Sequence, residues 1–214
     1  MGGCNYSDFV GVMMKVLFEF IIIIYVTLMP TILGPMLSMV LLKSKFLHGI
    51  HKVIDFGKNA WDGNRIFGDN KTWRGFWIYV IATAVVSVLW GELCKYIPAI
   101  GSYNTLYTYH ENTFFYNLII GMIFGASYPL FELPNSFLKR RLGINSGNTQ
   151  KANGWKGNIF RIVDLVDSGI GCLLVWYIIY PIKLWQCVFM IVLSAVTHYG
   201  CIWLLCRVKI KKSM

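Results

Sequence analysis

Long apolar runs dominate this sequence and constrain its fold more than any other feature. Of its 214 residues, 56% are hydrophobic and only 14% are charged, whereas charged residues make up about a quarter of a typical soluble domain. A run of roughly 20 apolar residues can cross the hydrocarbon core of a bilayer as a helix. We therefore expect an all-α integral membrane protein with a single polytopic domain. The five expected spans are residues 10–42, 76–97, 114–133, 161–180 and 184–206.

The first apolar run is longer than one span requires, and Pro30, Gly34 and Pro35 interrupt it. Because proline removes a backbone hydrogen-bond donor, we expect a kinked or broken first helix. Glu19 also lies in this run, where a lone carboxylate would be costly. Lys15 precedes it by one helical turn, so we expect the two side chains to pair.

Two further patterns concern packing within the bilayer. Gly121 and Gly125 form a G-x-x-x-G pattern in the third run, which is typical of a close contact between helices. The six cysteines form no C-x-x-C pair, and most of them lie in apolar runs. We expect them to be free thiols, without a zinc site or a disulfide framework.

Basic residues are unevenly distributed among the polar segments. Lys and Arg number 20 against 10 Asp and Glu, a net charge of +10. Because these residues sit between apolar runs, they suit anionic lipids, phosphorylated substrates or topology, and we expect no nucleic-acid partner. Most lie in the loops 43–75 and 134–160 and in the C-terminal tail, which five spans place on one side. The positive-inside rule predicts an outside N-terminus, a cytoplasmic C-terminus and two polar cytoplasmic loops that form the site.

The densest polar stretch is residues 65–75, which read R-I-F-G-D-N-K-T-W-R-G. Its basic side chains would neutralise phosphate charge, and its glycines would let the backbone approach a ligand closely. The alternative is an ordinary positive loop that only orients the next helix. A second basic cluster, S-F-L-K-R-R-L-G at residues 136–143, is expected on the same face. Anchoring at the membrane interface is the alternative for this cluster.

Asp164 and Asp167 form a pattern suited to metal binding. Residues three apart on a helix share one face, with Cβ atoms about 5–6 Å apart, and carboxylate oxygens suit Mg²⁺. The alternative is that acids in a first helical turn merely complement the helix dipole. Because Asp167 lies too deep for capping alone, we expect Mg²⁺ at this pair. Together with the two basic clusters, it predicts a polyphosphate site for phosphoryl or nucleotidyl transfer.

Histidines supply two weaker candidates. His48 and His51 lie three residues apart near Asp55 and would permit a metal site, although exposed interfacial histidines are the expected state. His198, within the fifth span, is expected to hydrogen-bond between helices and not to act in catalysis.

Four segments together resemble the CDP-archaeol synthases, which are five-span members of the wider CDP-diglyceride synthetase (phosphatidate cytidylyltransferase) superfamily. They are V-I-D-F-G at residues 53–57, the two basic strings at 65–75 and 136–143, and D-x-x-D at 164–167. Their order and the five-span layout cover most of the chain. The two basic strings are specific, whereas D-x-x-D alone is not.

The resemblance implies transfer of CMP from CTP to a membrane lipid phosphate, with release of pyrophosphate, in phospholipid biosynthesis. It implies Mg²⁺ as cofactor and CTP and a lipid phosphate as partners, and it leaves a homo-oligomer open. The alternatives are a phosphatidate cytidylyltransferase that makes CDP-diacylglycerol and a non-enzymatic membrane protein that binds anionic lipids. A small transporter is a further alternative, but no internal repeat supports it.

The residues expected to form the site fall into three groups. Those expected to act in catalysis are Asp69, Lys71, Arg74, Lys139 and Arg140. Those expected to bind substrate are Asp55, Arg65, Gly68, Asn70, Thr72, Gly75, Ser136 and Arg141. Asp164 and Asp167 are expected to bind Mg²⁺, with Asp69 as a further ligand or as a residue that orients the ligands.

Overall fold

The computed structural model describes residues 6–146 and 154–208, and these are mostly helical. The long helices are α1 (Tyr6–Lys43), α2 (Trp73–Tyr96), α4 (Phe114–Arg141), α5 (Gly154–Ile179) and α6 (Leu184–Arg207). The short ones are η1 (His48–Ile50), α3 (Pro98–Gly101) and η2 (Thr105–Tyr107). Within these residues, two isolated β-bridges are the only extended pairing. All five long helices are long and apolar enough to cross a membrane, which confirms the predicted all-α membrane class.

Helices α2 and α4 form the most extensive contact in the bundle, and two glycines make it possible. A Cβ atom on Gly121 would lie 2.6 Å from the Ser87 side chain, and one on Gly125 would lie 2.7 Å from the Val80 Cα. Real Cβ atoms do not approach other atoms so closely, so both positions require glycine. The G-x-x-x-G pattern therefore marks a close helix contact, as predicted.

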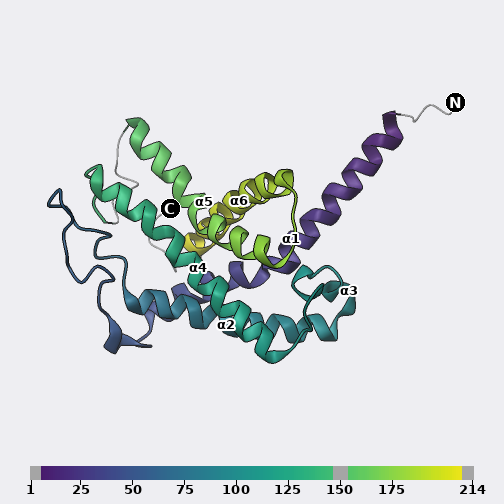
Figure 1. Cartoon of the computed structure of the whole chain (residues 1–214), viewed down its shortest axis with the longest axis horizontal. Coiled ribbons are helices and arrows are strands. Elements are labelled where there is room, and N and C mark those ends of the chain that lie inside the picture. The colour runs from purple at the N-terminus through teal and green to yellow at the C-terminus, as the bar shows by residue number, and fades with distance from the viewer. Residues whose placement is uncertain (1–5, 147–153, 209–214) are drawn as a thin grey trace.

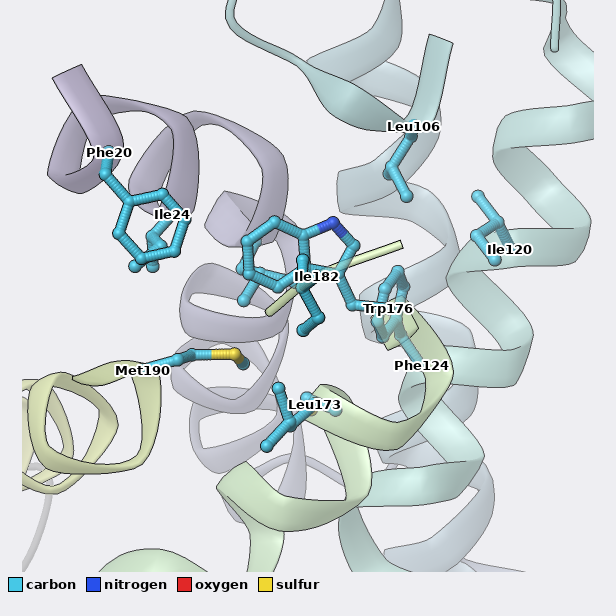
Figure 2. Packing of buried hydrophobic residues seen from close by; sticks show 11 residues of the cluster. Phe20, Ile24, Leu106, Ile120, Phe124, Leu173, Trp176, Ile182 and Met190 are labelled. Carbon is cyan, nitrogen blue, oxygen red and sulfur yellow. The ribbon is translucent and has the colours of Figure 1, made fainter. Parts of the chain in front are cut away.

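Apolar side chains from α1, α4, α5 and α6 meet around Trp176, which is fully buried (Figure 2). Phe124 and Leu173 lie next to it in the same cluster. The indole nitrogen of Trp176 donates to the Thr105 hydroxyl at 2.9 Å, and that hydroxyl also bonds to Thr27 at 3.1 Å. The one polar atom of this large ring is thus satisfied inside an apolar cluster.

Residues 6–43 form one continuous helix although Pro30 and Pro35 lie inside it, so the alternative of a broken first helix is wrong. Its 38 residues would extend about 57 Å, well beyond the roughly 30 Å hydrocarbon core. Figure 1 shows its N-terminal part projecting from the bundle and the helix changing direction as it enters. Lys15 and Glu19 are both exposed. The described part of the chain contains no ion pair between them, contrary to the expected pairing.

The second polar loop is shorter than the predicted 134–160, because helices extend into it from both ends. Helix α4 continues through Pro134 to Arg141, and α5 already begins at Gly154. Pro134 is exposed, whereas Asn135 directly after it is buried, so the helix keeps its buried face across the proline. The second basic cluster therefore lies mainly on a helix. Of the remaining connection, residues 147–153 lie outside the described residues.

The loop between α1 and α2 is organised around the carboxylate of Asp55, which is buried. It accepts hydrogen bonds at 3.0 Å from the backbone nitrogens of Gly57, Phe67 and Gly68, and at 2.7 Å from Arg65. Burial opposes ionisation, but the bonds from Arg65 and the three amides outweigh it and hold the pKa of Asp55 well below its usual range. One side chain thus joins distant parts of the loop.

Both ends of this loop are attached to the start of α2. Arg74, which is buried, donates to the carbonyls of Ser44 at 2.6 Å and Phe46 at 2.9 Å, just beyond the end of α1. Thr72 caps α2 by accepting a hydrogen bond from the Gly75 nitrogen at 3.0 Å. These contacts place the residues that follow Gly68 directly against the bundle.

Gly125→Ala should destabilise the bundle, because the added methyl group would displace the α2 backbone. Overpacking of this kind costs about 1–3 kcal/mol, so the thermal unfolding midpoint in detergent should fall by several degrees. Gly200→Ala on α6 is the matched control, because its Cβ would meet nothing within 4 Å. An unchanged midpoint for Gly125→Ala would contradict the close α2–α4 contact.

Asp55→Asn should loosen the loop, because the amide cannot replace a charged acceptor for Arg65. The loss of about 3 kcal/mol should speed hydrogen exchange at the Gly57, Phe67 and Gly68 amides on the order of 100-fold. Since the native pKa lies below the unfolded value of about 3.9, the stabilisation is complete above that value and is lost as the pH falls. The difference in stability of the loop between the wild type and Asp55→Asn should therefore stay constant from about pH 5 to 8 and shrink toward pH 3.

The control for this variant is Asp69→Asn. Asp69 contacts the same arginine at 2.6 Å, but its side chain is 75% exposed. An exposed ion pair contributes less than about 1 kcal/mol, so exchange at these amides should change only slightly. Equal effects of the two substitutions would contradict the central role of Asp55.

Candidate functional site

One face of α4 carries a polar stripe formed by Glu132, Asn135, Ser136 and Lys139. Their spacing of three, four and seven residues from the first places them one above another on a helix. Asn135, Ser136 and Lys139 are buried. Buried polar and charged groups require partners, and α5 provides them.

The stripe contacts the two aspartates of α5. The Asn135 amide nitrogen donates to Asp164 at 2.5 Å and to Asp167 at 2.8 Å. The Lys139 ammonium forms an ion pair with Asp164, and Asp167 also accepts a hydrogen bond from the Ser168 nitrogen at 2.7 Å. Both carboxylates therefore face the same amide, and neighbouring donors compensate both of them.

The loop contributes Lys71 to the same region. Its ammonium forms an ion pair with Glu132, one turn before Asn135 on the stripe. Negative charge on Glu132 and Asp164 interacts electrostatically with Asp167. Two lysines and three carboxylates thus gather where the loop meets α4 and α5, on the left side of Figure 1.

Arg140 joins the end of α4 to the loop at Gly68. Its Nε donates to the Phe67 carbonyl at 3.0 Å, and its Nη1 donates to the Ile144 carbonyl. Gly68 has a φ of +98°, and a Cβ atom there would lie 2.9 Å from the Arg140 Nε. Glycine is required here both for its backbone conformation and for the close approach of the guanidinium.

Arg141 holds the preceding part of the loop. It donates to the carbonyls of Asn64 at 3.0 Å and Arg65 at 2.5 Å, and forms an ion pair with Asp62 at 2.8 Å. Its guanidinium also lies over the ring of Phe137, 4.7 Å from the centroid. The two arginines of α4 therefore bind loop carbonyls in this state of the protein.

The structure separates the residues predicted for the site into two sets. Lys139 contacts the acidic pair of Asp164 and Asp167 through Asp164, Lys71 pairs with Glu132 on the same stripe, and Ser136 is buried on that stripe. The set whose contacts hold the loop or its junction with α2 is Asp55, Arg65, Gly68, Thr72, Arg74, Gly75, Arg140 and Arg141. Asp69 and Asn70 are exposed, and Asp69 pairs with Arg65 rather than with the acidic pair.

Glu132 and Asn135 were not predicted for the site from the sequence. The predicted third span ends at Leu133, whereas α4 continues through Pro134 to Arg141. A span that ends at Leu133 hides the helical spacing of the polar residues on either side of Pro134. Had the helix been continued, Glu132, Asn135, Ser136 and Lys139 would have fallen on one face. That spacing is the signal that would have revealed the two residues.

The oxygen atoms at this site fit a magnesium ion. Asn135 Oδ1 is buried without a hydrogen-bond partner, and the oxygen and nitrogen of an amide interchange by a half-turn of the side chain. That turn would direct three oxygens, from Asn135, Asp164 and Asp167, toward one point. The described residues contain no cluster of three His, Cys, Asp or Glu able to hold a metal. Two carboxylates are nevertheless enough for Mg²⁺, because this ion usually takes one or two of them and completes its shell with water and substrate phosphate.

The histidine pair near the loop provides no comparable site. The rings of His48 and His51 stack with their centroids 6.0 Å apart, and both residues are exposed. In the fifth span, His198 Nδ1 lies 3.4 Å from the Leu165 carbonyl of α5. This contact confirms the expected interhelical hydrogen bond.

Comparison with known proteins identifies the family of this chain. The family described as CarS-like CDP-archaeol synthase matches residues 13–214. A CDP-archaeol synthase of Methanococcoides burtonii is 30% identical over 140 residues, which cover 64% of this chain and 71% of that protein. One from Archaeoglobus fulgidus is 37% identical over 95 residues, which cover 44% of this chain and 49% of that protein.

A solved structure, of an intramembrane enzyme for archaeal membrane lipid biosynthesis, shares the fold. It superimposes with a TM-score of 0.54 over 82% of this chain and 90% of that one, at 21% sequence identity. The five-helix architecture is therefore found in a known membrane enzyme. Because the family match covers nearly the whole sequence, this chain belongs to the CarS-like CDP-archaeol synthase family.

Proposed function

We propose that the site between the α4 stripe, the α5 aspartates and Lys71 transfers a cytidylyl group from CTP to the phosphate of a membrane lipid. As a member of its family, the chain is a nucleotidyltransferase of lipid biosynthesis. The observation that carries the assignment to this site is the gathering of Lys71, Lys139, Asp164 and Asp167 at one point. Because the relatives are CDP-archaeol synthases, the proposed acceptor is a diether glycerol phosphate.

In the proposed reaction an oxygen of the lipid phosphate attacks the α-phosphorus of CTP. A new oxygen–phosphorus bond forms, the bond between the α-phosphorus and the bridging oxygen breaks, and pyrophosphate leaves with that electron pair. A phosphate monoester is largely dianionic near neutral pH because its second pKa is about 6, so no strong general base is required. Repulsion between anions dominates the barrier, so positioning and charge neutralisation supply the catalysis.

Asp164 and Asp167, with Asn135 after its amide turns, are the residues proposed to hold Mg²⁺. When bound, the ion would neutralise phosphate charge and bring the reacting groups together. Asp69 is exposed on the loop, so we assign it to orienting Arg65 and not to the metal.

Lys71 and Lys139 are proposed to contact phosphate oxygens. Each now pairs with a carboxylate, and a polyphosphate offers an ammonium group the same kind of partner with more charge. The lysines would therefore exchange Glu132 and Asp164 for phosphate oxygens as the nucleotide arrives. This exchange would also release Asp164 to bind the metal.

Arg65, Arg74, Arg140 and Arg141 are proposed to act by positioning the loop. Their donors are directed to Asp55 and Asp69, to carbonyls near the end of α1 and to carbonyls of the loop itself. They would keep the loop around Gly68 and Asn70 in position beside Lys71. The excess of basic residues at this end supports a cytoplasmic site, with the N-terminus outside.

Purified protein with Mg²⁺ and labelled CTP should form a CDP-lipid from an unsaturated diether glycerol phosphate. Phosphatidic acid, tested in parallel, should react more slowly if the acceptor is of the archaeol type. A faster reaction with phosphatidic acid would instead favour a phosphatidate cytidylyltransferase. Absence of both CTP binding and product would contradict the proposed function and favour a lipid-binding protein.

Asp164→Asn should lower kcat/KM by about 100- to 1,000-fold, the usual effect of removing one preorganised electrostatic contact. It should also raise the Mg²⁺ concentration needed for half-maximal activity. Glu111→Gln is the matched control, because Glu111 is an exposed acid that precedes the N-terminal end of α4. Asp164 contacts the other end of α4, through Asn135 and Lys139. Wild-type activity of Asp164→Asn would contradict the metal assignment.

Lys71→Met should weaken CTP binding at least about 10-fold, because it removes a phosphate partner and leaves Glu132 uncompensated. Lys95→Met is the control, because Lys95 also forms an ion pair, with Glu92, near the opposite end of α2. Titration of CTP by calorimetry compares the two. Equal affinities of the variants would show that Lys71 does not contact the nucleotide.

A further inference from the structure

Helices α1, α5 and α6, together with Tyr128 of α4, line a half-open apolar groove. Its lining extends along α1 from Ile24 to Met39 and along α6 from Met190 to Leu205. Each stretch advances 15 residues along its helix, about 22 Å at 1.5 Å per residue, which is most of the roughly 30 Å hydrocarbon core. The groove therefore runs lengthwise with the membrane-spanning helices.

The lining residues are apolar or uncharged except for one histidine. No aspartate, glutamate, lysine or arginine is among the described residues that form its wall. A charged ligand group would find no oppositely charged carboxylate, lysine or arginine in this wall, whereas a hydrocarbon chain would bury apolar surface along it. The chemistry of the wall thus selects a long apolar group.

One edge of the groove lies beside the acidic site. Ser168 and Tyr128 both line it. Ser168 directly follows Asp167, and Tyr128 precedes Glu132 by one helical turn on α4. A chain in the groove would therefore reach a head group held at the aspartates.

We infer that this groove holds one apolar chain of the lipid phosphate acceptor, with its phosphate toward Asp167. The inference rests on the proposed function for the identity of the head group. The groove's length, its direction and its continuity with the acidic site all favour a lipid chain. The other occupant to be tested is a helix from a second copy of this chain.

The test compares two neighbouring residues on α6. Leu193 lines the groove, whereas Val192 lies outside it and is 59% exposed. Leu193→Trp should raise the KM for a long-chain diether glycerol phosphate at least 10-fold, and Val192→Trp should leave it unchanged. The KM for CTP and turnover of a water-soluble short-chain glycerol phosphate should stay within twofold in both. A long-chain KM unaffected by Leu193→Trp would overturn the inference, and Met36→Trp repeats the test from α1 if that variant does not fold.

Photo-crosslinking of the wild-type protein separates this inference from the proposed function. A glycerol phosphate lipid with a diazirine in its chain should label groove residues of α1 and α6, as mapped by peptide mass spectrometry. Labelling there without turnover would support the groove and contradict the enzymatic role. Turnover with labelling confined to the outer faces would overturn the groove. A doubled molecular mass in detergent that Leu193→Trp reduces to the monomer would assign the groove to a second copy instead.

Discussion

Charge buried between α4 and α5 is neutralised by partners from both helices, and the polar end of the bundle depends on this compensation. Asp167 and Lys139 are buried, and Asn135 links the two aspartates. An unpaired charge in such surroundings costs several kcal/mol, so the register of the two helices is restricted to the one that aligns these partners. Because the lysines of the site also need anionic partners, an arriving anion would compete with the carboxylates for them.

In the loop before α2, outside the membrane, buried charge is likewise compensated by neighbouring donors. Asp55 gathers three amides and Arg65, while Arg140 and Arg141 connect the loop to the end of α4. This network gives the stretch of 29 residues between α1 and α2 a defined shape with only the short helix η1 and isolated β-bridges. It also keeps Lys71 beside Glu132. The arginines thus hold the loop together, whereas Lys71 and Lys139 pair with carboxylates of the helices and are the cations proposed to exchange their partners.

The apolar part of the bundle joins the helices that carry the loop and the polar stripe, and it also forms the groove. Close contact at Gly121 and Gly125 joins α2, which carries the loop, to α4, which carries the polar stripe. Elsewhere in the bundle, α1, α5 and α6 leave a lengthwise groove whose lining includes Ser168, the residue after Asp167. Close packing on one side of α4 and a groove on the other would let a membrane lipid and a water-soluble nucleotide approach the same residues from different phases.

The sequence alone determined the features that depend on local pattern: the five apolar spans, the glycine contact, the pairing of Asp164 with Asp167 and the family resemblance. It predicts the basic residues of both clusters but not their separate partners, and it does not indicate Glu132 and Asn135 as site residues, because Pro134 favours a helix end at Leu133. Only the tertiary structure decided which cation meets which carboxylate, as Lys71 and Glu132 lie 61 residues apart. Hydrophobicity and helical spacing act over neighbouring residues, whereas compensation of buried charge is settled by how distant segments pack.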